Sequence, residues 1–186
     1  MKIQEQAPAK INLALNILGR RTDGYHELRM VMQSVSLCDT VTVEETGIGF
    51  TLLADGFTVP TGKSSLEQQA AEAFFAAVGR PMPPLTVHLE KTTPAYAGLG
   101  GGSADVAALL RCLRRQYAPE MPVEQLRGIG LTVGSDMPFC VSGGTALAEG
   151  RRKTSLCRPF SVQSISHAMR RGQLSRFSFC PSRIPQ

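Results

Sequence analysis

The chain has 186 residues, 42% of them hydrophobic, so it can bury one good core and is short for two domains. It has no run of eighteen apolar residues, and Lys2, Glu5 and Lys10 interrupt the stretch where a signal peptide needs an apolar core. Five cysteines without a C-x-x-C pair argue against a disulfide framework and a zinc site. We therefore expect a cytoplasmic protein with no metal-ligating side chains.

The net charge of +5 comes from the C-terminal end of the chain. Residues 151–186 contain 8 of the 20 Lys and Arg residues and no Asp or Glu, so residues 1–150 carry a net charge of −3. The tail 151–186 also shows no sustained apolar period. We expect one domain over 1–150, followed by a basic tail that is an interaction arm, a disordered linker or a stretch translated out of frame.

The first strand is predicted over residues 9–17, where apolar and other residues alternate. Its predicted buried face consists of Ile11, Leu13, Leu15 and Ile17. Its opposite face consists of Lys10, Asn12, Ala14 and Asn16.

Further strands are predicted over 27–36, 39–45, 48–54, 85–91 and 143–149. Apolar stripes predict two helices. The first, over 65–78, has its stripe on Leu66, Ala70, Ala73, Phe74 and Ala77. The second, over 103–117, has Ser103 as N-cap and its stripe on Val106, Leu109, Leu110, Leu113 and Tyr117. Because strands and helices do not alternate regularly, we expect an α+β fold rather than a doubly wound parallel sheet.

A glycine-rich loop precedes the second predicted helix, in the stretch PAYAGLGGGSADVAALL, residues 94–110. Glycines let a backbone approach an anion, and a helix N-terminus supplies unpaired N–H groups and a positive dipole end. The stretch matches neither the G-x-x-x-x-G-K-[ST] phosphate loop nor the G-x-G-x-x-G dinucleotide loop. Read alone, the loop is either a phosphate site or a structural turn.

Three other places carry polar residues that suit catalysis or binding, each with a structural alternative. Asp136, in GSDMPF, is either a helix N-cap or a general base. Lys10 and its neighbour Asn12 either face a ligand or are solvated on an open strand. In RTDGYHEL, Tyr25 and His26 either stack on and hydrogen-bond a base or form a packed turn.

Three stretches together resemble the galactokinase, homoserine, mevalonate and phosphomevalonate (GHMP) kinase superfamily. They are PAKINLALNILGRRTDGYHEL, PAYAGLGGGSADVAALL and LTVGSDMPFCVSGGTALAEG, and the resemblance runs over residues 1–150. The glycine loop is common to the superfamily. PAKINLAL followed by DGYH is specific to its branch of 4-(cytidine 5′-diphospho)-2-C-methyl-D-erythritol kinases, which act in the methylerythritol phosphate route to isoprenoid precursors.

The resemblance implies an ATP-dependent kinase that phosphorylates the 2-hydroxyl of the cytidine diphosphate erythritol, with Mg²⁺ accompanying the nucleotide. Lys10 and Asp136 would be catalytic, with Asp136 taking the hydroxyl proton and Lys10 steadying the developing charge. Asn12, Tyr25 and His26 would bind the substrate. The ATP-binding loop would comprise Pro94, Ala95, Tyr96, Ala97, Gly98, Leu99, Gly100, Gly101, Gly102, Ser103 and Ala104.

The fold implied is the GHMP-kinase N-terminal α+β domain with a left-handed β-α-β crossover. Relatives continue for roughly another hundred residues into a second domain, and residues 151–186 do not resemble it. We therefore expect the second domain to be missing and the activity of this chain to be impaired. The alternative is a non-catalytic nucleotide- or nucleic-acid-binding fragment that uses the basic tail. We expect a small-molecule partner, no nucleic acid and no membrane, and the sequence leaves the oligomeric state open.

Overall fold

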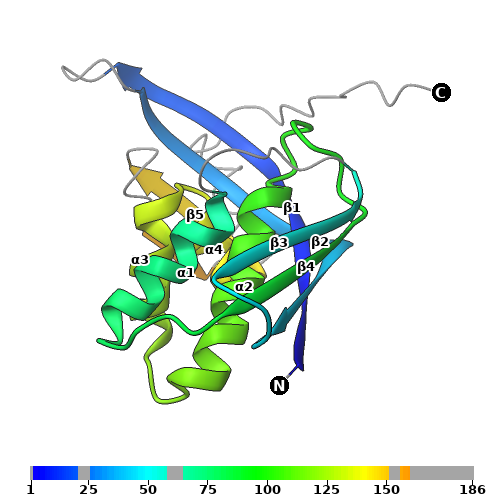
Figure 1. The fold of residues 1–186 in the computed structure, drawn as a ribbon. Helices are drawn as coiled ribbons and strands as arrows, with labels where there is room; N and C mark the ends of the chain where they lie inside the picture. Colours follow the sequence, from blue (N-terminus) through cyan, green and yellow to red (C-terminus); the bar gives the residue numbers. More distant parts are fainter. Residues whose placement is uncertain (1, 21–25, 58–64, 151–155, 160–186) are drawn as a thin grey trace.

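The computed structural model describes residues 2–20, 26–57, 65–150 and 156–159, which form one sheet with helices packed on it (Figure 1). The strands are β1 (Lys2–Arg20), β2 (His26–Glu44), β3 (Phe50–Gly56), β4 (Leu85–Lys91), β5 (Thr145–Gly150) and β6 (Leu156–Pro159). The helices are α1 (Leu66–Ala77), α2 (Gly101–Tyr117), α3 (Val123–Val133) and α4 (Met137–Ser142).

The sheet divides along β2. One edge of β2 pairs antiparallel with β1, from Lys2↔Glu44 at one end to Arg20↔His26 at the other. Its other edge pairs with β4 over residues 40–44 and with β5 over residues 28–33. Between these two pairings, residues 34–39 of β2 have neither β4 nor β5 beside them.

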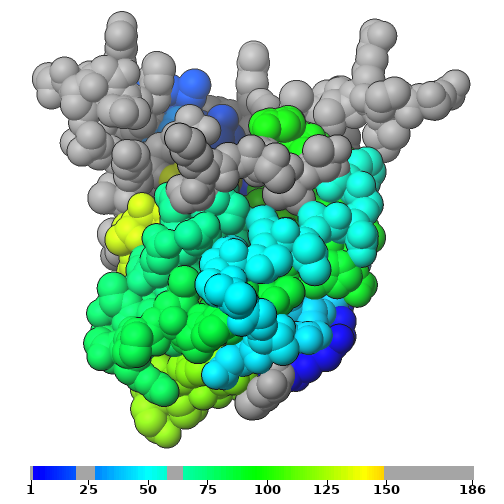
Figure 2. Space-filling view, in the orientation of Figure 1, coloured from blue at the N-terminus to red at the C-terminus, as the bar shows by residue number. Residues whose placement is uncertain are grey.

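The predicted crossover unit is present, because β3 pairs parallel with β4 and α1 connects them. The α+β prediction is confirmed: β3–β4 is the parallel pair, and the other described pairs are antiparallel. Figure 2 shows α1 and β3 side by side on the face turned to the viewer.

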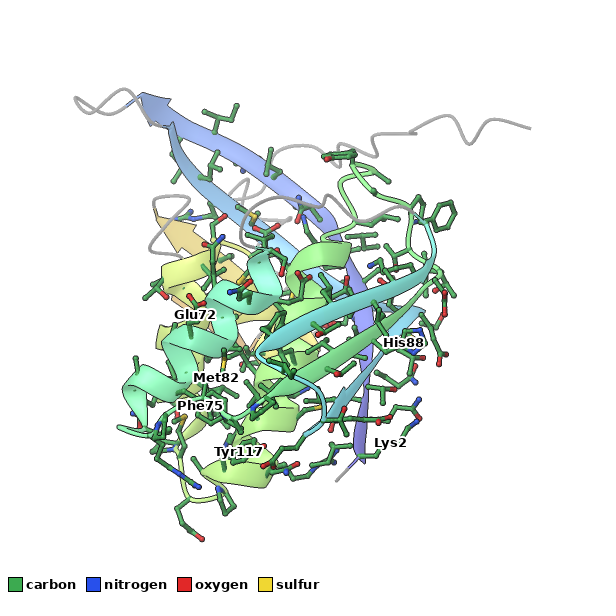
Figure 3. All side chains as sticks on the ribbon, in the orientation of Figure 1. Lys2, Glu72, Phe75, Met82, His88 and Tyr117 are labelled. Carbon is green, nitrogen blue, oxygen red and sulfur yellow. The ribbon has the colours of Figure 1, made fainter. Side chains whose placement is uncertain are left out.

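The core lies between the sheet and the helices. The largest fully buried side chains are Phe74, Phe139, Met32, Leu85, Leu89, Leu109, Leu110, Leu113, Leu126, Met137, Val31 and Val41. Near the C-terminal end of α2, the rings of Phe75 and Tyr117 meet edge to face at a centroid distance of 5.0 Å and join α1 to α2 (Figure 3). Burial of these apolar faces holds the helices on the sheet.

Both predicted helices are confirmed, with differences at their first turns. Ser65 is the N-cap of α1 and its hydroxyl accepts from the Gln68 N–H at 3.1 Å. The predicted N-cap Ser103 is wrong, because α2 begins at Gly101 and Gly100 is its N-cap. Leu66, predicted on the buried stripe, is 42% exposed because it is the first residue of α1. The sequence analysis did not predict α3.

The predicted faces of the first strand are wrong. Ile17, expected to be buried, is 62% exposed, whereas Lys10 and Ala14, expected on the open face, are 6% and 5% exposed. Irregularities between Pro8 and Lys10 and between Asn12 and Ala14 interrupt the β1–β2 register. Each irregularity changes which residues point toward the helices, so simple alternation does not give the buried face.

Several strand boundaries also differ from prediction, and β1 extends over Lys2–Arg20 rather than over 9–17. The strands expected over 27–36 and 39–45 are one continuous strand, β2. In the tail, residues 156–159 form β6, which pairs antiparallel with β5 and was not expected. The rest of the tail lies outside the described residues, so its nature stays a prediction.

Candidate functional site

The glycine loop connects the end of β4 to the start of α2 and has a backbone that glycine favours. Gly98 and Gly100 have φ values of 74° and 69°, in the left-handed region. Gly100 caps the helix N-terminus without a side chain, and its carbonyl accepts from the Ala104 N–H at 2.9 Å. Tyr96 also has a positive φ, 58°, and is 92% exposed at the loop's outer part. The first-turn N–H groups of α2 therefore lie beside a loop whose glycines, which lack side chains, let its backbone approach an anion.

Lys10 lies directly against this loop. Its backbone N–H donates to the Leu99 carbonyl at 2.8 Å, which ties β1 to the loop. Its side chain passes beneath Gly100, where an added Cβ would lie 2.9 Å from the Lys10 Cγ and 3.0 Å from its Cε. Glycine at position 100 is therefore required both for the backbone angle and for the space that the lysine occupies.

Asp136 occupies the N-cap position of α4, but its side chain makes no capping hydrogen bond. Its Oδ2 lies 3.3 Å from the Lys10 Nζ, and the side chains of Asp136 and Lys10 are 35% and 8% exposed. The carboxylate thus pairs with a buried cation while remaining partly open to solvent. Of the two roles left open by the sequence, this geometry favours a catalytic carboxylate over a capping one.

The other predicted site residues are placed less completely. Asn12 is half-buried on β1, and its Oδ1 is buried without a hydrogen-bond partner among the described residues. Ser103 is half-buried in the first turn of α2. His26 begins β2 opposite Arg20, but its side chain is outside the description, and Tyr25 lies outside the described residues altogether.

A buried charge cluster behind the loop was missed by the sequence analysis. Lys91, the last residue of β4, binds the Asp39 Oδ2 from β2 and the Asp105 Oδ2 from α2, the latter at 2.5 Å. The three side chains are 6%, 0% and 2% exposed. Asp39 stands in a strand of alternating residues, and Lys91 and Asp105 flank the loop. None of these positions carries a local sequence signal that distinguishes it from a surface charge.

The cluster has uneven proton affinities. Burial raises the pKa of Asp105 to about 7, although Lys91 acts in the opposite direction. Burial also opposes ionisation of Asp39, but hydrogen bonds from Lys91 and from the Thr93 and Thr92 amides outweigh it and lower its pKa. The two carboxylates raise the pKa of Lys91 despite its burial, so the lysine stays charged.

Among residues 2–20, 26–57, 65–150 and 156–159, no group of three or more His, Cys, Asp and Glu side chains is placed to hold a metal ion. No helix within these ranges has the length and apolar character needed to cross a bilayer.

Comparison with known proteins agrees with this geometry. Residues 65–144 match the family described as the GHMP kinases N terminal domain. A curated relative from Geobacter sulfurreducens, named 4-diphosphocytidyl-2-C-methyl-D-erythritol kinase, is 41% identical over 150 residues, covering 80% of this chain and 53% of the relative. A relative of the same name from Clostridium botulinum is 39% identical over 157 residues, covering 84% of this chain and 56% of its own length.

Solved structures give the same result at the level of the fold. A crystal structure of 4-(cytidine 5′-diphospho)-2C-methyl-D-erythritol kinase has a TM-score of 0.69 and 36% identity, covering 86% of this chain and 55% of that one. The mevalonate kinase of Methanococcus jannaschii, at 13% identity and a TM-score of 0.63, shares the fold over 87% of this chain and 56% of its own. The chain spans about half the length of the curated relatives it matches. From the matched domain, the relatives and the shared fold, we conclude that the chain contains the GHMP kinases N terminal domain.

Proposed function

We propose that this chain provides the phosphoryl-transfer site of an ATP-dependent kinase. Its substrate is 4-(cytidine 5′-diphospho)-2-C-methyl-D-erythritol, phosphorylated on the 2-hydroxyl in the methylerythritol phosphate route to isoprenoid precursors. The observation that carries the proposal is the contact of Lys10 with both Gly100 and Asp136, which joins the loop, a buried cation and a carboxylate in one place. The names of the relatives supply the substrate.

The roles of the loop, Asp136 and Lys10 follow from the chemistry of phosphoryl transfer, which needs positioning and charge neutralisation more than covalent catalysis. The backbone N–H groups at the start of α2 bind the phosphates of ATP. Asp136 accepts the proton of the attacking hydroxyl, for which its partly exposed carboxylate is accessible. The Lys10 ammonium neutralises charge as it develops on the transferred group.

Mg²⁺ belongs to the same proposal. This ion prefers oxygen ligands and usually keeps several waters while it binds substrate phosphates with one or two protein groups. The phosphate oxygens of ATP and water would supply the ligands of this ion, which would shield the charge of the phosphates, and the proposal assigns the ion no side chain of this chain.

Substrate selection is assigned to Asn12, Tyr25 and His26. The buried, unpartnered Oδ1 of Asn12 supports a polar ligand on this side of β1, because such an atom gains most from a donor. The roles of Tyr25 and His26 in holding the cytosine, and a cytoplasmic location, stay predictions from the sequence. No observation among the described residues favours the alternative of a non-catalytic binding fragment.

The test is transfer of phosphate from ATP to the cytidine diphosphate erythritol by the 186-residue chain, followed by ³¹P NMR. Asp136→Asn should lower the rate by about 10²–10⁴-fold, as expected when a general base is lost. Lys10→Met should lower it by about 10²–10³-fold. Product formation that is unchanged by both substitutions would refute the assigned roles, and phosphorylation of a different acceptor only would refute the substrate.

A further inference from the structure

The strongest feature that the proposed function leaves unused is the buried cluster of Asp39, Lys91 and Asp105. Its members come from β2, β4 and α2, and they meet where the sheet divides and residues 34–39 of β2 lack a neighbouring β4 or β5 strand. Burying three charged groups is unfavourable, because the loss of hydration is offset only by opposite charges and hydrogen bonds in good geometry. The position of the cluster beside the loop indicates what it does.

Asp39 holds the start of the loop. Its Oδ1 accepts from the backbone N–H groups of Thr92 and Thr93, at 2.6 and 2.7 Å, while its Oδ2 binds Lys91. The Thr92 hydroxyl also donates to the neighbouring Cys38 carbonyl at 2.7 Å. These bonds fix the two residues that lead from β4 into Pro94, so the entry to the loop cannot shift without breaking several of them.

Lys91 connects that entry to the exit of the loop. Its Nζ reaches Asp105, one turn after Gly101, and lies 3.5 Å from where a Cβ on Gly101 would be. The ammonium therefore lies directly behind the backbone that begins α2. The same backbone carries the unpaired N–H groups of the helix N-terminus.

Two polar atoms beside this backbone have no hydrogen-bond partner among the described residues. They are the Asp105 Oδ1 and the Thr93 Oγ1, both buried. The unpartnered carboxylate oxygen makes Asp105 the least satisfied member of the cluster, which fits the rise of its pKa to about 7.

We propose that Asp39, Lys91 and Asp105 are positioning residues of the nucleotide site, which hold both ends of the glycine loop and place a cation behind its phosphate-binding backbone. This inference rests on the proposed function for its ligand, ATP. It assigns no contact with ATP to the three side chains, because all are buried. They act through the loop.

The charge of the cluster also affects the phosphates. With both carboxylates ionised, the cluster carries one net negative charge behind the loop, and with Asp105 protonated it is neutral. The other charged groups that face this region are Lys10 on β1, beneath Gly100, and Glu67 on α1, whose pKa responds to Lys91. ATP affinity should therefore fall as the pH rises through 7, by roughly tenfold for one added charge near the phosphates.

Three variants of the 186-residue chain test the proposal. Asp39→Ala removes the acceptor for both loop N–H groups, Asp105→Asn keeps an oxygen for Lys91 but cannot ionise, and Glu67→Gln is the control. Glu67 is also a buried carboxyl, 3% exposed, but it bonds Ser65 and its own backbone rather than the loop. Amide hydrogen exchange of residues 95–104 without ligand, ATP binding by calorimetry from pH 6 to 8.5, and thermal melting are measured for each.

We expect Asp39→Ala to speed exchange in residues 95–104 and to weaken ATP binding by at least about tenfold, since small displacements of a binding loop are costly. Asp105→Asn should keep the exchange pattern of the unaltered chain and lose the extra fall of affinity above pH 7. ATP's own titration is common to all variants and cancels in the comparison. Glu67→Gln should not change loop exchange.

Loop exchange and ATP affinity equal to the unaltered chain in a folded Asp39→Ala variant would overturn the proposal. If Asp39→Ala does not fold, the test is the dependence of ATP affinity on pH in Asp105→Asn. The same dependence as in the unaltered chain overturns the proposal, and a weaker dependence supports it. Lack of ATP binding by the unaltered chain would refute the proposed function alone, because hydrogen exchange still shows whether Asp39 holds the loop.

Discussion

The four glycines of the loop allow the two demands on it, backbone angle and space, to be separated by alanine substitution. Gly98 and Gly100 have positive φ, whereas Gly101 and Gly102 do not. An added Cβ at Gly98 or Gly102 meets nothing within 4 Å, and one at Gly100 lies 2.9 Å from the Lys10 Cγ. Each of the four substitutions therefore tests a different combination of strain and contact.

The magnitudes follow from these geometries. Gly98→Ala meets only the left-handed strain and should lower the free energy of unfolding by about 1–2 kcal/mol. Gly102→Ala meets neither, and it should be neutral or raise this free energy by up to about 1 kcal/mol through better helix propensity. Gly100→Ala combines the strain with overpacking of about 1–3 kcal/mol, so we expect a total loss of roughly 2–5 kcal/mol.

Gly101→Ala isolates contact without strain. Its Cβ would lie 3.0 Å from the Thr93 Cγ2 and 3.3 Å from the Thr93 Cβ. Thr93 is fully buried and cannot move aside freely. The overpacking, about 1–3 kcal/mol, should outweigh the gain in helix propensity of up to about 1 kcal/mol, so this variant is destabilised less than Gly100→Ala.

The assay is equilibrium urea denaturation, with the phosphoryl-transfer rate measured on the same samples. Gly100→Ala should lose most activity even where it is folded, because its Cβ displaces Lys10 from Asp136, while Gly102→Ala keeps its stability. Equal unfolding free energies for Gly100→Ala and Gly102→Ala would refute the geometric reasoning. A Gly98→Ala variant less stable than Gly100→Ala would refute the role assigned to the lysine contact.

Three further predictions concern buried ionisable groups. Burial raises the pKa of Glu67, so the stability that its protonation contributes is full below its unfolded pKa and is lost as the pH rises through the folded pKa. Glu67→Gln should therefore gain stability over the unaltered chain as the pH rises from 4 to 8. A difference in the free energy of unfolding between the two proteins that shrinks over this range would contradict this reading. Lys91→Met leaves two buried carboxylates without their cation and should destabilise the chain by about 3–5 kcal/mol in urea denaturation, an expectation that a melting curve unchanged at pH 8 would disprove. Burial raises the pKa of the Cys112 thiol to about 12, so iodoacetamide at pH 8 should alkylate the half-buried Cys38 before Cys112. Peptide mapping that finds Cys112 modified before Cys38 would show that α2 opens readily.

Local sequence signals were sufficient where the structure depends on neighbouring residues. The helices α1 and α2 follow from apolar stripes that the tertiary contacts then bury, and β4 matches its predicted range of 85–91. The glycine loop could be located because only glycine accommodates the angles at positions 98 and 100 without strain. Lys10 and Asp136 could be named because the stretches that contain them resemble those of the GHMP kinases; the residues alone left both roles open.

The orientation of β1 could not be predicted in this way. Alternation places Lys10 on an open face, but the irregularities after Pro8 and Asn12 turn it toward the loop and leave Ile17 exposed. Such irregularities depend on the pairing with β2, which the residues of β1 do not encode by themselves.

The sequence by itself therefore determined the helices α1 and α2, the strand β4 and the loop, because these depend on backbone preference and local order, and its resemblance to the kinases named the two catalytic candidates. Only the tertiary structure brought Lys10 to within 3.3 Å of Asp136 and joined Asp39, Lys91 and Asp105 behind the loop. Both arrangements connect residues distant in the chain. Their physical cause is the burial of charge between packed elements, where a carboxylate or an ammonium is stable only with a partner that another element supplies.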